Sequence, residues 1–140
     1  MPAYGIAQSG WNPPPNQGLN LADVVPGEKI VLFDGTETAA AGLASIAFAR
    51  GYSPDAADNG ITFNLSGMPA GMTVDVQVCS PPAGGFASTA AMAAAFSTVA
   101  TIAPDSGGNG WYTDVGRSAF YRLQISAYTS GAMCVGVAQR

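Results

Sequence analysis

The strongest constraint on the fold of this chain is an alternation of apolar and polar residues that recurs in four short segments. Apolar residues occupy every second position in these segments: Ile61, Phe63 and Leu65; Val74, Val76 and Val78; Tyr121, Leu123, Ile125 and Ala127; Met133, Val135 and Val137. Successive side chains of a β-strand point to opposite faces of the sheet. The pattern therefore predicts amphipathic strands, each with one buried face.

Further strands are predicted at residues 29–33, which end at the turn signal Asp34-Gly35, at 97–102 and at 111–115. Residues 43–49 fit a strand or a short helix equally. In all, seven or eight short strands with turn signals at spacings of about 8–12 residues predict an all-β antiparallel β-sandwich, either jelly-roll or immunoglobulin-like. Amphipathic strands are atypical of a parallel α/β sheet.

One short helix is predicted at residues 88–96. Ser88 is placed to cap it, and Met92 and Phe96 lie one turn apart on the same face. The competing interpretation is an Ala- and Gly-rich loop.

The 140 residues fit one domain, which we expect to comprise an N-terminal arm, 1–27, and a β-sandwich, 28–140. Three consecutive prolines, Pro13, Pro14 and Pro15, lack backbone donors and favour an extended arm. The apolar residues Trp11, Leu19 and Leu21 suggest that the arm docks across its own sandwich or onto a neighbouring molecule.

Charged residues make up 10% of the chain, whereas a typical soluble domain has about 25%. The mean hydropathy is +0.21, so the polar residues are mostly uncharged. When another protein covers such a surface, few charged groups lose their hydration, which favours extensive protein–protein contact. An extracellular domain with a neutral, Ser- and Thr-rich surface is the alternative.

Several functions are disfavoured by composition. The sequence has no histidine, which removes imidazole bases, histidine-based triads and most zinc sites. Most of the nine carboxylates lie in turn contexts, including Asp34, Asp58 and Asp105, whereas Asp75 and Asp114 are expected to be solvated strand residues. We therefore expect no enzymatic activity, no catalytic residues, no cofactor and no metal site.

The partners expected for this chain are proteins. Its five cations are scattered, which disfavours direct nucleic-acid binding. The N-terminus does not have the pattern of a signal peptide, and prolines and glycines interrupt the uncharged stretch 76–104, so we expect a soluble, non-membrane protein made in the cytoplasm.

The two cysteines, Cys79 and Cys134, alternate with valines and are predicted to face away from the core. They are expected to be free thiols at an oligomer interface, although a bridge between neighbouring strands stays open. The candidate interface residues are Trp11, Pro13, Pro14, Pro15, Leu19, Leu21, Cys79 and Cys134.

The second half of the chain resembles a known family. The segments TVDVQV at 73–78, FSTVATI at 96–102 and AFYRLQISAYTSG at 119–131 resemble a β-sandwich module common in virion proteins of tailed bacteriophages. The resemblance covers about residues 61–140 and rests on pattern, without a catalytic motif.

This resemblance implies a non-enzymatic decoration, or cement, protein on the capsid surface of the virion, synthesised in the host cytoplasm. Such a protein binds the major capsid protein and clamps neighbouring subunits, often as a homotrimer. A neck, tail or head-fibre component belongs to the same class. The alternative from another class is an extracellular carbohydrate-binding or adhesion module, with Trp11, Trp111, Tyr112 and Tyr128 as a sugar-stacking platform.

Overall fold

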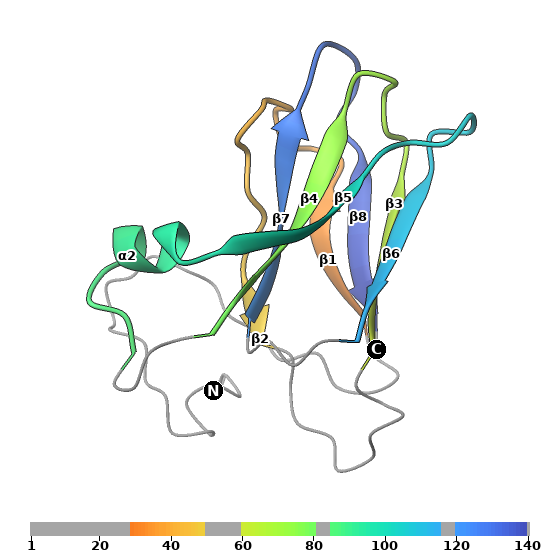
Figure 1. The fold of residues 1–140 in the computed structure, drawn as a ribbon. Helices are drawn as coiled ribbons and strands as arrows, with labels where there is room; N and C mark the ends of the chain where they lie inside the picture. Colours follow the sequence, from red (N-terminus) through yellow and green to blue (C-terminus); the bar gives the residue numbers. More distant parts are fainter. Residues whose placement is uncertain (1–28, 50–59, 81–84, 116–119, 140) are drawn as a thin grey trace.

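The computed structural model describes residues 29–49, 60–80, 85–115 and 120–139 (Figure 1). These residues form eight strands and one short helix: β1 (Lys29–Asp34), β2 (Phe48–Ala49), β3 (Ile61–Ser66), β4 (Thr73–Cys79), α2 (Thr89–Ala94), β5 (Ser97–Ile102), β6 (Gly110–Asp114), β7 (Phe120–Ala127) and β8 (Val135–Gln139). The predicted arm, 1–27, lies outside the described residues.

The strands form two antiparallel sheets, ordered β1-β8-β3-β6 and β2-β7-β4-β5. Strand β1 pairs with β8, β2 with β7, β3 with β6 and β4 with β5. These four antiparallel pairs are those of one long hairpin that is folded over so that its strands form two sheets. This topology is a jelly roll. The predicted antiparallel sandwich is confirmed, and of the two topologies left open the pairing is that of the jelly roll.

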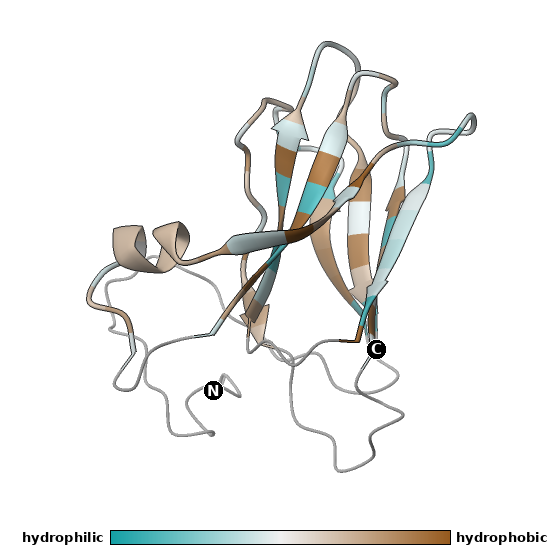
Figure 2. Ribbon diagram, viewed as in Figure 1, coloured by the Kyte–Doolittle hydropathy of each residue, from teal (hydrophilic) through white to brown (hydrophobic). Residues whose placement is uncertain are grey.

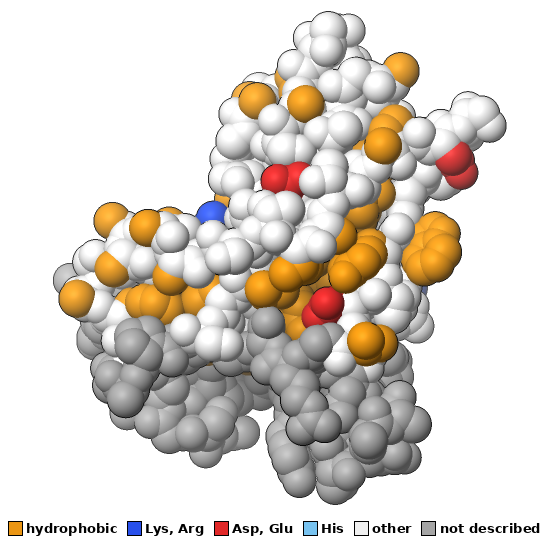
Figure 3. Space-filling model, in the orientation of Figure 1, with side chains coloured by type: hydrophobic (Ala, Val, Ile, Leu, Met, Phe, Trp, Pro, Cys, Tyr) orange, Lys and Arg blue, Asp and Glu red, His pale blue; other side chains and the backbone are white. Residues whose placement is uncertain are grey.

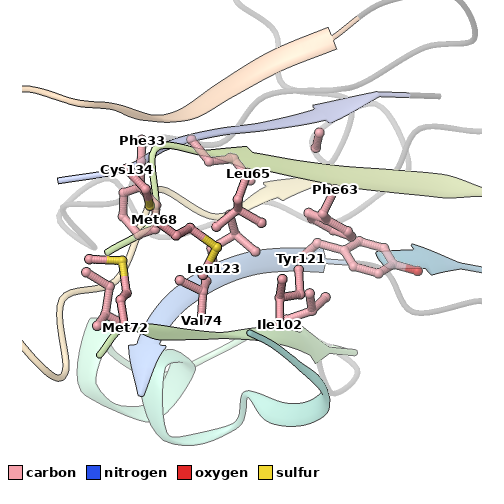
Figure 4. Packing of buried hydrophobic residues seen from close by; sticks show 14 of the residues in the cluster. Phe33, Phe63, Leu65, Met68, Met72, Val74, Ile102, Tyr121, Leu123 and Cys134 are labelled. Carbon is pink, nitrogen blue, oxygen red and sulfur yellow. The ribbon is translucent and has the colours of Figure 1, made fainter. Parts of the chain in front are cut away.

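The main core lies between the two sheets (Figure 4). The rings of Phe48 in β2 and Tyr121 in β7 stack with their centroids 5.8 Å apart. The ring centroid of Phe63, in the opposite sheet, lies 6.1 Å from that of Phe48 and 5.9 Å from that of Tyr121. Along most strands, brown apolar positions alternate with pale or teal ones (Figure 2). The period-two pattern therefore predicted the buried face correctly for β3, for the first half of β4 and for β7 as far as Ile125, whereas Ala127 at the end of β7 is exposed.

A second, smaller cluster covers the outer face of sheet β2-β7-β4-β5. It contains Ala47, Ala49, Cys79, Phe86, Met92 and Phe120, with Phe96 packed against it. The predicted helix is confirmed as α2, and the amide of Ala91 donates to the Ser88 hydroxyl at 3.0 Å. Two turns of helix are marginal alone, and the fully buried Met92 supplies the packing that holds this one.

The segment that precedes β2 is extended. The Gly42 and Ser45 amides donate to the Ile125 and Leu123 carbonyls of β7, at 2.7 Å and 2.8 Å. Of the two conformations that residues 43–49 fit, the structure therefore adopts the strand-like one along the edge of its sheet.

Strand β8 presents the face opposite to the predicted one. Cys134 and Gly136 are buried, whereas Val135 is 39% exposed and Val137 is half-buried. A Cβ on Gly136 would lie 3.1 Å from Cδ1 of Leu123. Because large side chains from other strands already fill this part of the core, β8 contributes its small residues to the interior and turns its valines outward.

Replacing Gly136 with valine should therefore overfill the core. We expect Gly136→Val to lower the free energy of unfolding by about 1–3 kcal/mol, measured by urea denaturation. The matched change on the outer face of the same strand, Val135→Thr, should alter it by less than about 0.5 kcal/mol. Equal effects of the two substitutions would contradict the assigned face.

Candidate binding surfaces

The carboxylates of the described residues mostly organise the protein's own backbone. The Thr36 amide and hydroxyl donate to Oδ1 of Asp34, at 2.9 Å and 2.6 Å, and lower the pKa of that carboxyl. Asp105 Oδ1 accepts from the amides of Gly107 and Asn109 at 2.8 Å and 3.0 Å. The turn role predicted for Asp34 and Asp105 is confirmed, whereas Asp58 lies outside the described residues. Within those residues no group of three or more potential metal ligands occurs.

The two strand carboxylates differ from each other. Asp75 accepts from the hydroxyls of Thr98 and Thr101 on the outer face of its sheet. Asp114 is only 9% exposed, which corrects its prediction as a solvated residue. The Tyr121 hydroxyl donates to Asp114 Oδ2 at 2.7 Å, so this carboxylate joins β6 to β7 of the opposite sheet.

The cysteines are not surface thiols, contrary to the sequence-based expectation. Cys134 is fully buried in the main core because β8 turns its small residues inward. Cys79 does face away from the valines of β4, but the second cluster covers it with Phe86 and Met92. Both thiols are free. Burial raises the pKa of Cys79 to about 11, against the opposing effect of Arg122, and also raises the pKa of Cys134.

Protonated, buried thiols are poor nucleophiles. We therefore expect Cys79 and Cys134 to resist modification by a disulfide-based thiol reagent at neutral pH in the folded protein. Both should react within the mixing time in denaturant, giving two thiols per chain by absorbance. Rapid modification of either cysteine under native conditions would contradict its burial.

One candidate binding surface covers α2 and β5. We define the α2–β5 surface by its exposed residues, all of them small or β-branched and uncharged: Ala90, Ala91, Ala93, Ala94, Ser97, Thr98, Val99 and Thr101. Residues 85–104 contain no Lys, Arg, Asp or Glu. Figure 3 shows that the side chains over α2 and along β5 are mostly hydrophobic or uncharged. Strand β5 is the edge of its sheet and pairs with β4 alone.

A second candidate surface lies on the outer face of sheet β1-β8-β3-β6. The strand register aligns Val31, Val137, Asn64 and Trp111 in one row across all four strands. Trp111 is 71% exposed. An open depression of about 320 Å³, here called the Trp111 depression, is lined by Asn64, Leu65, Ser66, Asn109, Gly110, Trp111, Val135 and Val137.

The structure does not assemble the predicted platform of four aromatic residues. Tyr112 follows Trp111 in β6 and so faces the opposite side of the strand. Tyr128 lies after β7, where its hydroxyl donates to the Gly131 carbonyl at 2.6 Å. Trp11 lies outside the described residues. Trp111 instead lies beside two asparagines, Asn64 and Asn109, which the sequence analysis did not single out.

The predicted interface residues of the arm also lie outside the described residues: Trp11, Pro13, Pro14, Pro15, Leu19 and Leu21.

In the described part of the chain, no helix has the length and apolar character that spanning a bilayer requires.

No family model, curated protein or solved structure matched this chain in our comparisons.

Proposed function

We propose that this chain is a structural protein of a tailed-phage virion that decorates the capsid shell by binding the major capsid protein through its α2–β5 surface. The observation that carries the proposal is the run of exposed, uncharged side chains over α2 and β5. The homotrimer and the capsid-surface location are parts of the same proposal.

Desolvation favours protein contact at this surface. Burying a charged group without a partner is strongly unfavourable. Residues 85–104 contain no charged side chain, and the carboxylate beside them, Asp75 of β4, already accepts hydrogen bonds from the Thr98 and Thr101 hydroxyls. Alanine loses no rotamer freedom on burial, and serine and threonine lose little. A partner can therefore cover the surface with a small loss of solvation and of side-chain entropy.

The surface is also held rigidly. The Arg122 guanidinium carbon lies 4.2 Å from the centroid of the Phe96 ring. Arg122 Nε donates to Gln77 Oε1 at 2.8 Å, and its NH2 group donates to the Ala93 carbonyl at 3.3 Å. These contacts fasten the end of α2 to the sheet, so little backbone freedom remains to be lost when a partner binds.

The edge strand gives further support. Exposed edges usually carry charges or prolines that prevent pairing with other chains. Strand β5, with the sequence STVATI, carries neither. An edge strand without such protection is tolerable when another protein covers it in the assembled state. The proposed attachment to the capsid shell would cover β5 in this way.

The fold is compatible with this role but does not select it. Jelly rolls occur in viral capsid proteins and also in lectins and cupins. The surface chemistry therefore supports the proposal more directly than the topology does.

A charge placed on the α2–β5 surface should abolish attachment. We expect Val99→Glu to reduce co-sedimentation of the chain with empty heads of its phage at least about tenfold, because burying the carboxylate is unfavourable. Val31→Glu is the matched control, since Val31 is a similarly exposed strand valine, 52% against 44%, on the other sheet.

Both variants should keep the parent's unfolding transition, since both positions are exposed. Loss of attachment in Val31→Glu but not in Val99→Glu would move the contact to the other sheet. Absence of binding by the parent chain would refute the decoration role.

A further inference from the structure

We propose that the Trp111 depression binds a neutral saccharide, with one pyranose ring of the sugar stacked against the Trp111 indole. This site would add a glycan-binding activity to the proposed structural role. It belongs to the sheet β1-β8-β3-β6, whereas the α2–β5 surface belongs to the other sheet.

The indole is presented on a fixed strand. Trp111 pairs directly with Asn64 of β3, and it remains 71% exposed although tryptophan has the largest apolar side chain. Strand pairing fixes the backbone that carries the indole, so only the two side-chain torsions of Trp111 remain to be ordered when a flat ligand stacks on it. The axial C–H groups of a pyranose form such a flat apolar face, and an aromatic plane complements it.

Polar groups surround the indole at the positions that a sugar would need. Each of the Asn64 and Asn109 amides can donate two hydrogen bonds and accept others, and the Ser66 hydroxyl can do both. Within the described part of the chain, none of these three side chains makes a hydrogen bond to the protein. They are therefore available to the hydroxyl groups of a ligand.

The loop that carries Asn109 is ordered by its own hydrogen bonds. Asp105 donates its amide to the Asn109 carbonyl at 2.8 Å, and Oδ1 of Asp105 accepts from the Asn109 amide at 3.0 Å. The Met68 amide donates to the Gly108 carbonyl at 2.9 Å, which ties this loop to the β3–β4 turn. The backbone of Asn109 is thus held in place before any ligand arrives.

The charge and size of the depression restrict the ligand class. None of its eight lining residues is ionisable, so a nucleotide, a phosphate or an acidic sugar would find no counter-charge. The volume of about 320 Å³ is near the lower end for small-molecule sites, which span about 300–1,000 Å³, and suits a mono- or disaccharide unit. A neutral polyhydroxylated ring satisfies the aromatic plane and the amides together.

The test uses the full chain in a Trp11→Phe background, in which Trp111 is the only tryptophan. Maltose, cellobiose, lactose and diacetylchitobiose are titrated separately while indole fluorescence and heat of binding are recorded. We expect a saturable change with at least one of them, insensitive to salt because neither side is charged.

The variants then locate the site. Trp111→Ala should weaken binding at least about tenfold through loss of the stacking plane, and Asn64→Ala should weaken it less. Val31→Ala, in the same row of the same face but outside the depression, should bind as the parent does. All variants are compared by calorimetry and by their unfolding transitions, so a misfolded variant is recognised.

No saturable binding of any of the four sugars, or binding that survives Trp111→Ala, would overturn the proposal. A co-sedimentation assay with phage heads distinguishes failure of the saccharide site from failure of the decoration role. The Trp111→Ala variant should attach to heads as the parent chain does. Loss of head attachment in Trp111→Ala without sugar binding would show instead that the depression is a protein contact.

Discussion

The two sheets enclose a limited volume, and the side chains that fill it determine which face each strand turns inward. Protein interiors are packed to near crystal density, so side chains that enter from one strand exclude those from another. Phe48, Phe63 and Tyr121 fill the centre and join the two sheets. Because Leu123, Phe33 and Leu65 occupy the space beside Gly136, strand β8 contributes the small residues Gly136 and Ala138 to the interior and turns Val135 and Val137 outward. Those two valines line the Trp111 depression, so the packing of the core shapes the outer face of the sheet.

The other sheet is organised differently because its outer face is partly covered. Helix α2 and Phe86 bury Phe120 and Cys79 in a second cluster, and Arg122 fastens the end of the helix to Gln77. The residues that remain exposed over α2 and β5 carry no charge, and the neighbouring Asp75 carboxylate is hydrogen-bonded to Thr98 and Thr101. Residues 85–104 are one of several uncharged segments of this chain, and covering them with another protein removes few charged groups from water.

The sequence predicted the local features well. Period-two alternation identified strands such as β3 and β7, Ser88 marked the start of α2, and Asp34 and Asp105 marked turns, because each of these signals depends on near neighbours in the chain. The orientation of β8 could not be read this way. Both faces of β8 carry small or apolar residues. Alternation therefore separates its residues into two faces but does not indicate which face is buried.

Features that depend on distant pairing were also missed. The burial of Cys79 needs α2 to fold over the sheet, and the burial of Asp114 needs Tyr121 on the opposite sheet. One signal was available for Asp114, since it shares a face of β6 with Tyr112 and not with Trp111. The proximity of Asn64 and Trp111 follows from the β3–β6 register, which links residues far apart in sequence.

Backbone amide exchange, compared between the free chain and the chain attached to phage heads, measures whether another protein covers the α2–β5 surface. If that surface is the contact, exchange slows on attachment within residues 90–101, with little change in β1 and β8. Slowing confined to β3 and β6, or no slowing in any described element, would contradict it.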